Sequence, residues 1–182
     1  MNGARAVGRG MASLLLAGLA GCASMSESEC QRADWYQKGV QDGRDGQVRD
    51  RIEDHTQACA KVGISPDAAR WQAGWSEGLR RYCRPVRGWE LGLKGEFYRG
   101  VCADQPEGED FERYYGAGRS VHELGQQLDR LYREMQRLER DLAAAKTDEE
   151  RRQLRAQLRE LDIEQMRLRQ RQRMELLSGP RP

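Results

Sequence analysis

Glycine recurs at helical spacing in three stretches of this sequence, and this pattern limits the folds open to the chain. The stretches cover residues 34–46, 70–83 and 85–102. Within them glycines follow one another after four and then three residues, which places them on one helix face: Gly39, Gly43 and Gly46; Gly74 and Gly78; Gly88, Gly92 and Gly95. Each glycine inside a helix costs about 1 kcal/mol relative to alanine. The spacing therefore predicts helices whose backbones approach each other closely.

Two alternatives accompany this interpretation. Asp42-Gly43 and Asp45-Gly46 are typical turn pairs, so some of the glycines would mark turns, although we favour helices. Large aromatic residues also occur in every stretch, and helical spacing favours a place for them in the core. The alternative is an exposed face that stacks on sugars such as those of peptidoglycan. These aromatic residues are Trp35 and Tyr36; Trp71, Trp75 and Tyr82; Trp89, Phe97 and Tyr98.

The first 22 residues have the pattern of a bacterial lipoprotein signal. A basic start without acids and a short apolar run are followed by Leu19-Ala20-Gly21-Cys22, which has the form of a lipobox. We expect residues 1–21 to be removed by cleavage between Gly21 and Cys22. Lipid on Cys22, as two or three acyl chains, would then anchor the protein stably in a membrane. The alternative is an ordinary signal peptide with an incidental cysteine.

The residue after the cysteine bears on location. Ala23, rather than aspartate, is similar to the sorting pattern of outer-membrane lipoproteins, so we expect a lipid-anchored protein of the outer membrane that faces the periplasm. Residues 22–29 are small and polar, and they are expected to form a tether.

Four further cysteines are predicted to form two disulfides: Cys30, Cys59, Cys83 and Cys102. Their number is even, and the signal directs the chain to an oxidising compartment where disulfides persist. Three pairings exist, and we favour Cys30–Cys59 with Cys83–Cys102 because each pair closes a local loop. The alternative is a zinc site that uses His55 and Cys59, which are spaced as neighbours on one helix face.

From residue 111 the composition changes to leucine, glutamate, arginine and glutamine. Leucine and methionine then follow a strict 4-3-4-3-4 spacing through Leu124, Leu128, Leu131, Met135, Leu138 and Leu142. Thr147 and Glu150 form a capping box, so a second helix starts there and continues with Leu154, Leu158, Leu161 and Leu168. We expect residues 111–177 to be an antiparallel coiled-coil hairpin and 178–182 a tail. Gln165 and Gln172 interrupt the seam of the second helix.

Charge and motifs exclude several function classes. The net charge is +2, and removal of Arg5 and Arg9 with the signal leaves 29 basic against 29 acidic residues, which argues against nucleic-acid binding. No catalytic motif is present, and His55 and His122 have no evident nucleophile beside them. The segment from Asp42 to Gly46 is only a weak match to a calcium loop. We therefore expect no catalytic residue, cofactor or resident metal.

The arrangement also resembles a known family, called domain of unknown function 2799. The residues that carry the resemblance are Asp34-Trp35-Tyr36, Gly39, Asp42-Gly43, Gly46, His55, Cys59, Gly74, Gly78-Leu79, Tyr82-Cys83, Gly88, Gly92, Gly95, Tyr98 and Val101-Cys102. The resemblance implies a small proteobacterial lipoprotein of the envelope and no established activity.

The sequence thus predicts an all-α protein. A disulfide-stapled helical domain of residues 30–110 would be followed by the hairpin. We expect a non-enzymatic envelope lipoprotein whose hairpin binds a partner or a second copy; the alternative is a glycan-binding lipoprotein that uses the aromatic repeat. Arg167, Arg169, Arg171 and Arg173 alternate along the second helix, and they indicate either a solvated face or a contact with anionic lipid or glycan.

Overall fold

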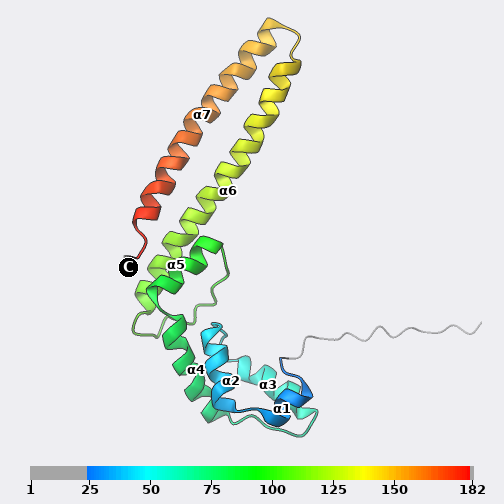
Figure 1. Cartoon of the computed structure of the whole chain (residues 1–182), viewed down its shortest axis with the longest axis vertical. Coiled ribbons are helices and arrows are strands. Elements are labelled where there is room, and N and C mark those ends of the chain that lie inside the picture. The colour runs from blue at the N-terminus through cyan, green and yellow to red at the C-terminus, as the bar shows by residue number, and fades with distance from the viewer. Residues whose placement is uncertain (1–23, 181–182) are drawn as a thin grey trace, which may run out of the picture.

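The computed structural model describes residues 24–180, and in this range the protein is entirely helical (Figure 1). The glycine-bearing helices lead into a long arm that the last two helices of the chain form (Figure 1). The expected all-α class, with two disulfides and a helical hairpin, is confirmed. The helices are α1 (Glu27–Arg32), α2 (Trp35–Arg44), α3 (Arg51–Ala60), α4 (Ala68–Tyr82), α5 (Pro85–Lys94), α6 (Gly108–Ala144) and α7 (Asp148–Leu177).

Local signals explain where several helices begin. The carboxylate of Asp34 accepts from the backbone N–H of Tyr36 at the start of α2, and that of Asp67 caps α4 in the same way. Pro85 occupies the first position of α5, where a missing N–H has no cost. Thr147 and Glu150 make the expected capping box at the start of α7. Each of these residues satisfies or avoids a backbone donor that the helix itself leaves unpaired.

The first two glycine stretches pack α2 directly against α4. A Cβ atom at Gly39 would lie 2.0 Å from the carbonyl oxygen of Trp71, and one at Gly74 would lie 2.0 Å from that of Tyr36. Gly43 and Gly78 meet one turn further along, where each faces the α-carbon of the other. The two backbones are therefore in contact, and no side chain fits between them. The helix interpretation is confirmed for these four glycines.

The third stretch packs α5 against the first turns of α6 in the same register. Gly88 faces the carbonyl oxygen of Phe111, and Gly92 faces the carbonyl oxygen of Tyr115. The first contact is equivalent to that of Gly39 with the carbonyl oxygen of Trp71. Gly118 supplies the glycine on α6, with an added Cβ 2.6 Å from the carbonyl oxygen of Trp89. The protein thus contains the same glycine-packed helix pair twice. The glycine spacing does not predict this fourth segment, which contains Gly116 and Gly118 and lies in the region expected to form the hairpin.

The last glycine of two stretches ends a helix rather than lying inside one. Gly46 has a φ of 62° and Gly95 a φ of 69°, a left-handed conformation that residues with a Cβ rarely adopt. Gly46 lies against the ring of Tyr82, and Gly95 lies against the imidazole of His122 in the equivalent place. The turn interpretation is therefore correct for Gly46 and Gly95, whereas Gly43 is helical.

One apolar core joins the two helix pairs. Only Cys83 and Arg84 separate the end of α4 from the start of α5. The side chains of Leu79 on α4, Leu91 on α5 and Phe111 on α6 are buried together, and the Cys83–Cys102 disulfide lies among them. Burial of each large apolar side chain contributes about 1.5–3 kcal/mol. The two pairs therefore form one folded body.

The hairpin has the seam that its leucines predict. Leu124, Leu131 and Leu168 are buried against one another between α6 and α7. The two glutamines lie in the same seam: Nε2 of Gln165 approaches the sulfur of Met135, and Nε2 of Gln172 lies 3.4 Å from the carbonyl oxygen of Val121. The glutamines therefore continue the contact with α6 instead of leaving its seam open.

Two expected boundaries differ from the structure. The limit between residues 110 and 111 falls inside α6, because that helix begins at Gly108 and packs first on α5 and then on α7. The tether expected over 22–29 is folded from residue 24 onward, since Met25 is buried and Ser26 caps α1. At the other end, Gly179 of the expected tail lies against the ring of Trp89. Within residues 24–180, none of the helices is both long and apolar enough to cross a membrane.

Candidate functional site

A buried aspartate on α2 is the centre of a polar cluster in the first helix pair. Asp42 is 4% exposed. Its Oδ2 atom lies 2.8 Å from Nε2 of His55 on α3 and 2.8 Å from Nε1 of Trp71 on α4. Its Oδ1 atom lies 3.7 Å from Nζ of Lys38, one turn earlier on α2. One carboxylate therefore ties α2 to both α3 and α4.

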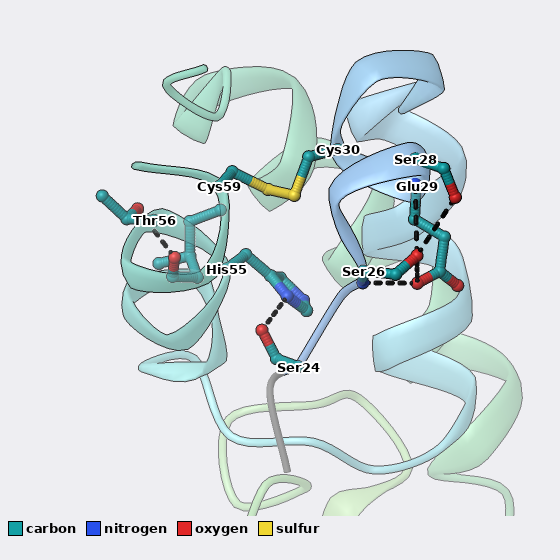
Figure 2. Close-up of a disulfide and its surroundings, with 9 residues drawn as sticks. Ser24, Ser26, Ser28, Glu29, Cys30, His55, Thr56 and Cys59 are labelled. Atoms are coloured by element: carbon teal, nitrogen blue, oxygen red, sulfur yellow. Dashed lines mark hydrogen bonds between the residues drawn. A yellow bond between two sulfur atoms is a disulfide. The ribbon is translucent and has the colours of Figure 1, made fainter. Parts of the chain in front are cut away.

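The hydrogen positions in this cluster follow from the chemistry of the carboxylate. An ionised carboxylate can only accept, so Nε2 of His55 and the indole N–H of Trp71 both donate to Asp42. Nδ1 of His55 shares a hydrogen bond of 2.9 Å with the hydroxyl of Ser24 (Figure 2). These hydrogen bonds connect the N-terminal segment to the centre of the first helix pair.

Asp42 is ionised in the fold although it is buried. Burial acts to raise the pKa of its carboxyl group. The hydrogen bonds from His55 and Trp71, together with the positive charge of Lys38, outweigh burial and hold the pKa of Asp42 below its ordinary value. The cluster is therefore stable with a charged carboxylate at neutral pH.

The segment that carries Ser24 is held by three kinds of contact. Met25 is 6% exposed and packs with Cys30, Ala58 and Cys59. Ser26 begins α1, where its hydroxyl accepts from the N–H of Glu29 and the carboxylate of Glu29 accepts from the N–H of Ser26. The Cys30–Cys59 disulfide then joins α1 to α3 beside His55 (Figure 2). The chain is consequently fixed from Ser24 onward.

Ser24, His55 and Asp42 are connected in the order of nucleophile, base and carboxylate that many hydrolases use. A base must meet the reacting proton within hydrogen-bond reach of a bound substrate. His55 is 0% exposed, and both of its ring nitrogens are engaged by Ser24 and Asp42. The arrangement is suited to holding the Ser24 segment in place rather than to proton transfer with a substrate.

The second helix pair lacks this polar cluster. By the glycine register, Leu91 stands where Asp42 stands in the first pair, and Phe111 stands where Trp71 does. Both of these residues are buried in the apolar core. The polar group of the second pair is instead Tyr98, whose hydroxyl donates to Glu112 and accepts from the N–H of Cys102. The buried Asp–His pair thus belongs to the helix pair next to the N-terminal segment.

The structure pairs Cys30 with Cys59 and Cys83 with Cys102, which are the pairs that we favoured. Cys59 is therefore not free to bind a metal with His55. Among residues 24–180, no group of three or more His, Cys, Asp or Glu side chains is arranged to hold a metal ion. Gly21 and Cys22 lie outside the described residues, so the expected cleavage and lipidation sites are not placed.

The aromatic residues of the repeat pack mainly inside the protein. Trp71 is 1% exposed and stacks on Trp75 at 6.0 Å between ring centres. Tyr98 and Tyr115 pack around the buried ring of Phe111. Phe97, at 78% exposed, is the exception in the third stretch. The structure therefore gives the glycan-binding alternative little exposed aromatic surface among the described residues.

Replacement of Asp42 by asparagine is expected to lower the free energy of unfolding by about 1–3 kcal/mol at pH 7, because a charged acceptor of two buried donors is lost. The folded pKa of Asp42 is depressed. Its ionisation therefore stabilises the fold above the unfolded-state pKa of about 3.9, and this stabilisation disappears as the pH falls through the lower folded value.

Urea unfolding at pH 7 and near pH 3, followed by circular dichroism, tests this expectation. The gap between wild type and Asp42→Asn should narrow at the lower pH. Asp45→Asn, at an exposed position three residues later, is the control and should show a small effect at both values. A gap for Asp42→Asn that stays constant between the two pH values would show that its charge does not stabilise the fold.

Comparison with known proteins identifies the family of the helix-pair region. Residues 34–120 match the family described as "Protein of unknown function (DUF2799)". The matched residues span both glycine-packed helix pairs. This confirms the resemblance noted in the sequence. No curated protein and no solved structure matches the chain.

Proposed function

We propose that this protein is a lipid-anchored, non-enzymatic protein of the bacterial envelope, bound to the periplasmic face of the outer membrane through Cys22. Its α6–α7 hairpin would be an arm that binds another protein. The observation that carries the proposal is the fixed position of Ser24, two residues after Cys22, against His55 of α3. The α1–α3 end lies at one end of the molecule, and the arm extends from the other (Figure 1).

The packing of the N-terminal segment supports a close anchor. Two residues of extended chain span at most about 7 Å. A lipid on Cys22 would therefore lie near Ser24, because the hydrogen bond to His55 and the burial of Met25 fix the chain there. A loose linker would let the body turn freely on the membrane. A short one favours a defined orientation, with the α1–α3 end toward the bilayer.

The shape of the hairpin supports the role of an arm. α6 contains 37 residues and α7 contains 30, which correspond to about 55 Å and 45 Å of helix. The buried seam faces inward, and the outer side of each helix faces solvent. The full burial of His55 supports a non-enzymatic role, since this imidazole offers a substrate no exposed surface.

Replacement of Cys22 by serine is expected to abolish lipidation and to leave the precursor uncleaved, because the thiol that receives the diacylglycerol is lost. Radioactive palmitate labelling of cells, followed by gel analysis, measures both effects. Ala23→Asp is the matched control: it should keep the label and, by the sorting pattern, move the protein to the inner membrane. Undiminished label in Cys22→Ser would refute the lipid anchor.

A further inference from the structure

The outer side of α7 carries a second apolar stripe, opposite the seam that packs on α6. Successive residues turn by 100° in a helix. The seam contains Leu161, Gln165, Leu168 and Gln172. The outer stripe lies about half a turn away and consists of Ile163, Met166, Gln170, Met174 and Leu177. Its apolar members are strongly exposed: Ile163 at 46%, Met166 at 63%, Met174 at 65% and Leu177 at 81%.

Four arginines flank this outer stripe on both sides. Arg167 and Arg171 lie along one edge, and Arg169 and Arg173 lie along the other. All four are exposed, and none of them forms an ion pair with another described residue. Residues 163–177 contain only two acids, Glu164 and Glu175. The last four turns of α7 therefore present apolar side chains between two rows of arginines.

The surface is also slightly hollowed along the edge that carries Arg167 and Arg171. A shallow cavity of 410 Å³ is lined by Arg167, Gln170, Arg171, Met174 and Glu175. Methionine side chains are flexible and fit irregular apolar partners. Arginine pairs with carboxylates through two parallel hydrogen bonds. The surface thus combines an adaptable apolar centre with edges suited to carboxylates.

Charge and position discriminate among the candidate occupants. A second copy that used the same stripe would bring arginine rows against arginine rows, which is repulsive. A lipid surface would have to approach α7 on its side away from α6, whereas the α1–α3 end lies on the opposite side of the molecule (Figure 1). A helix with an apolar stripe between two rows of carboxylates fits both the charge and the geometry.

We infer that the outer face of α7, from Ile163 to Leu177, binds an acidic amphipathic helix of another protein. This inference rests on the arm role proposed above and not on the lipid anchor. The partner helix would lie along about 20 Å of α7. Its apolar residues would cover Met166 and Met174, while its carboxylates would pair with the flanking arginines.

Fluorescence anisotropy with the full mature protein in detergent tests the inference. The probe is a labelled synthetic helix with a leucine stripe flanked by glutamates, and the comparison probe carries lysine at each glutamate position. We expect the acidic helix to bind at least about tenfold more tightly than the basic one, with an affinity that falls as salt is raised.

Charge reversal keeps the test independent of folding. Arg171→Glu with Arg173→Glu should weaken the acidic helix by about tenfold or more and strengthen the basic one. The matched control, Arg133→Glu with Arg140→Glu, changes two exposed arginines of α6 and should leave both affinities unchanged. A gain for the basic helix requires a folded surface, so it separates lost recognition from lost structure.

Three results would overturn the inference. The first is equal binding of the two helices, or binding of neither. The second is binding of vesicles that contain phosphatidylglycerol through these arginines, without binding of the acidic helix. The third is a dimer in analytical ultracentrifugation that charge reversal abolishes. These outcomes are independent of palmitate labelling at Cys22, so failure here leaves the anchor intact and failure of the anchor leaves this surface intact.

Discussion

Replacement of Gly74 by alanine is expected to destabilise the protein by about 3 kcal/mol or more, since the new methyl group has no space between α4 and α2. A Cβ atom there would lie 2.0 Å from the carbonyl oxygen of Tyr36 and 2.9 Å from its carbonyl carbon. The obstructing atoms belong to the backbone, which cannot rotate away as a side chain can. The helices must separate, and the contacts of Trp71 and Asp42 across the same interface would loosen with them.

The same substitution at Gly116 is the control, and its effect should have the opposite sign. Gly116 is an exposed residue inside α6, and a Cβ atom there would meet nothing within 4 Å. Because alanine is a better helix former, Gly116→Ala should stabilise the protein by up to about 1 kcal/mol. Thermal and urea unfolding measure both changes. A loss at Gly74 no larger than that of an ordinary surface substitution would contradict the close helix contact.

Removal of either disulfide is expected to cost about 3–4 kcal/mol in the chain-entropy model, with different structural consequences. The Cys83–Cys102 bond lies in the core that joins the two helix pairs, so its replacement by two alanines should lower the stability of the whole body. The Cys30–Cys59 bond joins α1 to α3 in a separate apolar cluster. Its removal should mainly release the Ser24 segment and α1.

Hydrogen exchange measured by mass spectrometry distinguishes the two cases. Without Cys30–Cys59, exchange should rise in residues 24–60 before it rises elsewhere, whereas without Cys83–Cys102 it should rise across both helix pairs. Non-reducing peptide mapping of the wild type checks the pairing itself. Recovery of a peptide that links Cys59 to Cys83, or of four free thiols, would contradict the described disulfides.

Much of the fold could be predicted because its signals are local and periodic. The glycine spacing indicated close helix contacts, and the spacing of leucine in α6 indicated the seam with α7. The fourth glycine segment was missed because Gly116 and Gly118 do not repeat the four-and-three spacing, and because leucine and arginine already dominate that region. Gly118 is distinguished by its contact with Gly92 on α5. The residue pattern of one helix does not show which residue of another helix it contacts.

The polar cluster could not be predicted for the same reason. The sequence alone places Asp42 in a turn or a weak calcium loop, and it relates His55 to Cys59. The structure instead places His55 between Asp42, 13 residues away, and Ser24, 31 residues away. One signal for the cluster is present in the sequence. Asp42 lies beside the glycine face of α2, where apolar residues are expected to pack, so a buried polar partner is expected there. The tether was misjudged because short polar residues are common both in linkers and at helix starts.

The continuity of α6 has a mechanical consequence for this protein. A single unbroken helix joins the glycine contacts at Gly118 to the tip of the hairpin at Ala144. A force applied at the tip is therefore transmitted directly to the two helix pairs. The body itself does not depend on how far the helix continues. One heptad added to each of α6 and α7 on either side of Lys146 would extend the reach by about 10 Å and preserve the seam. The length of the hairpin can therefore change in evolution without a change in the packing of the two helix pairs.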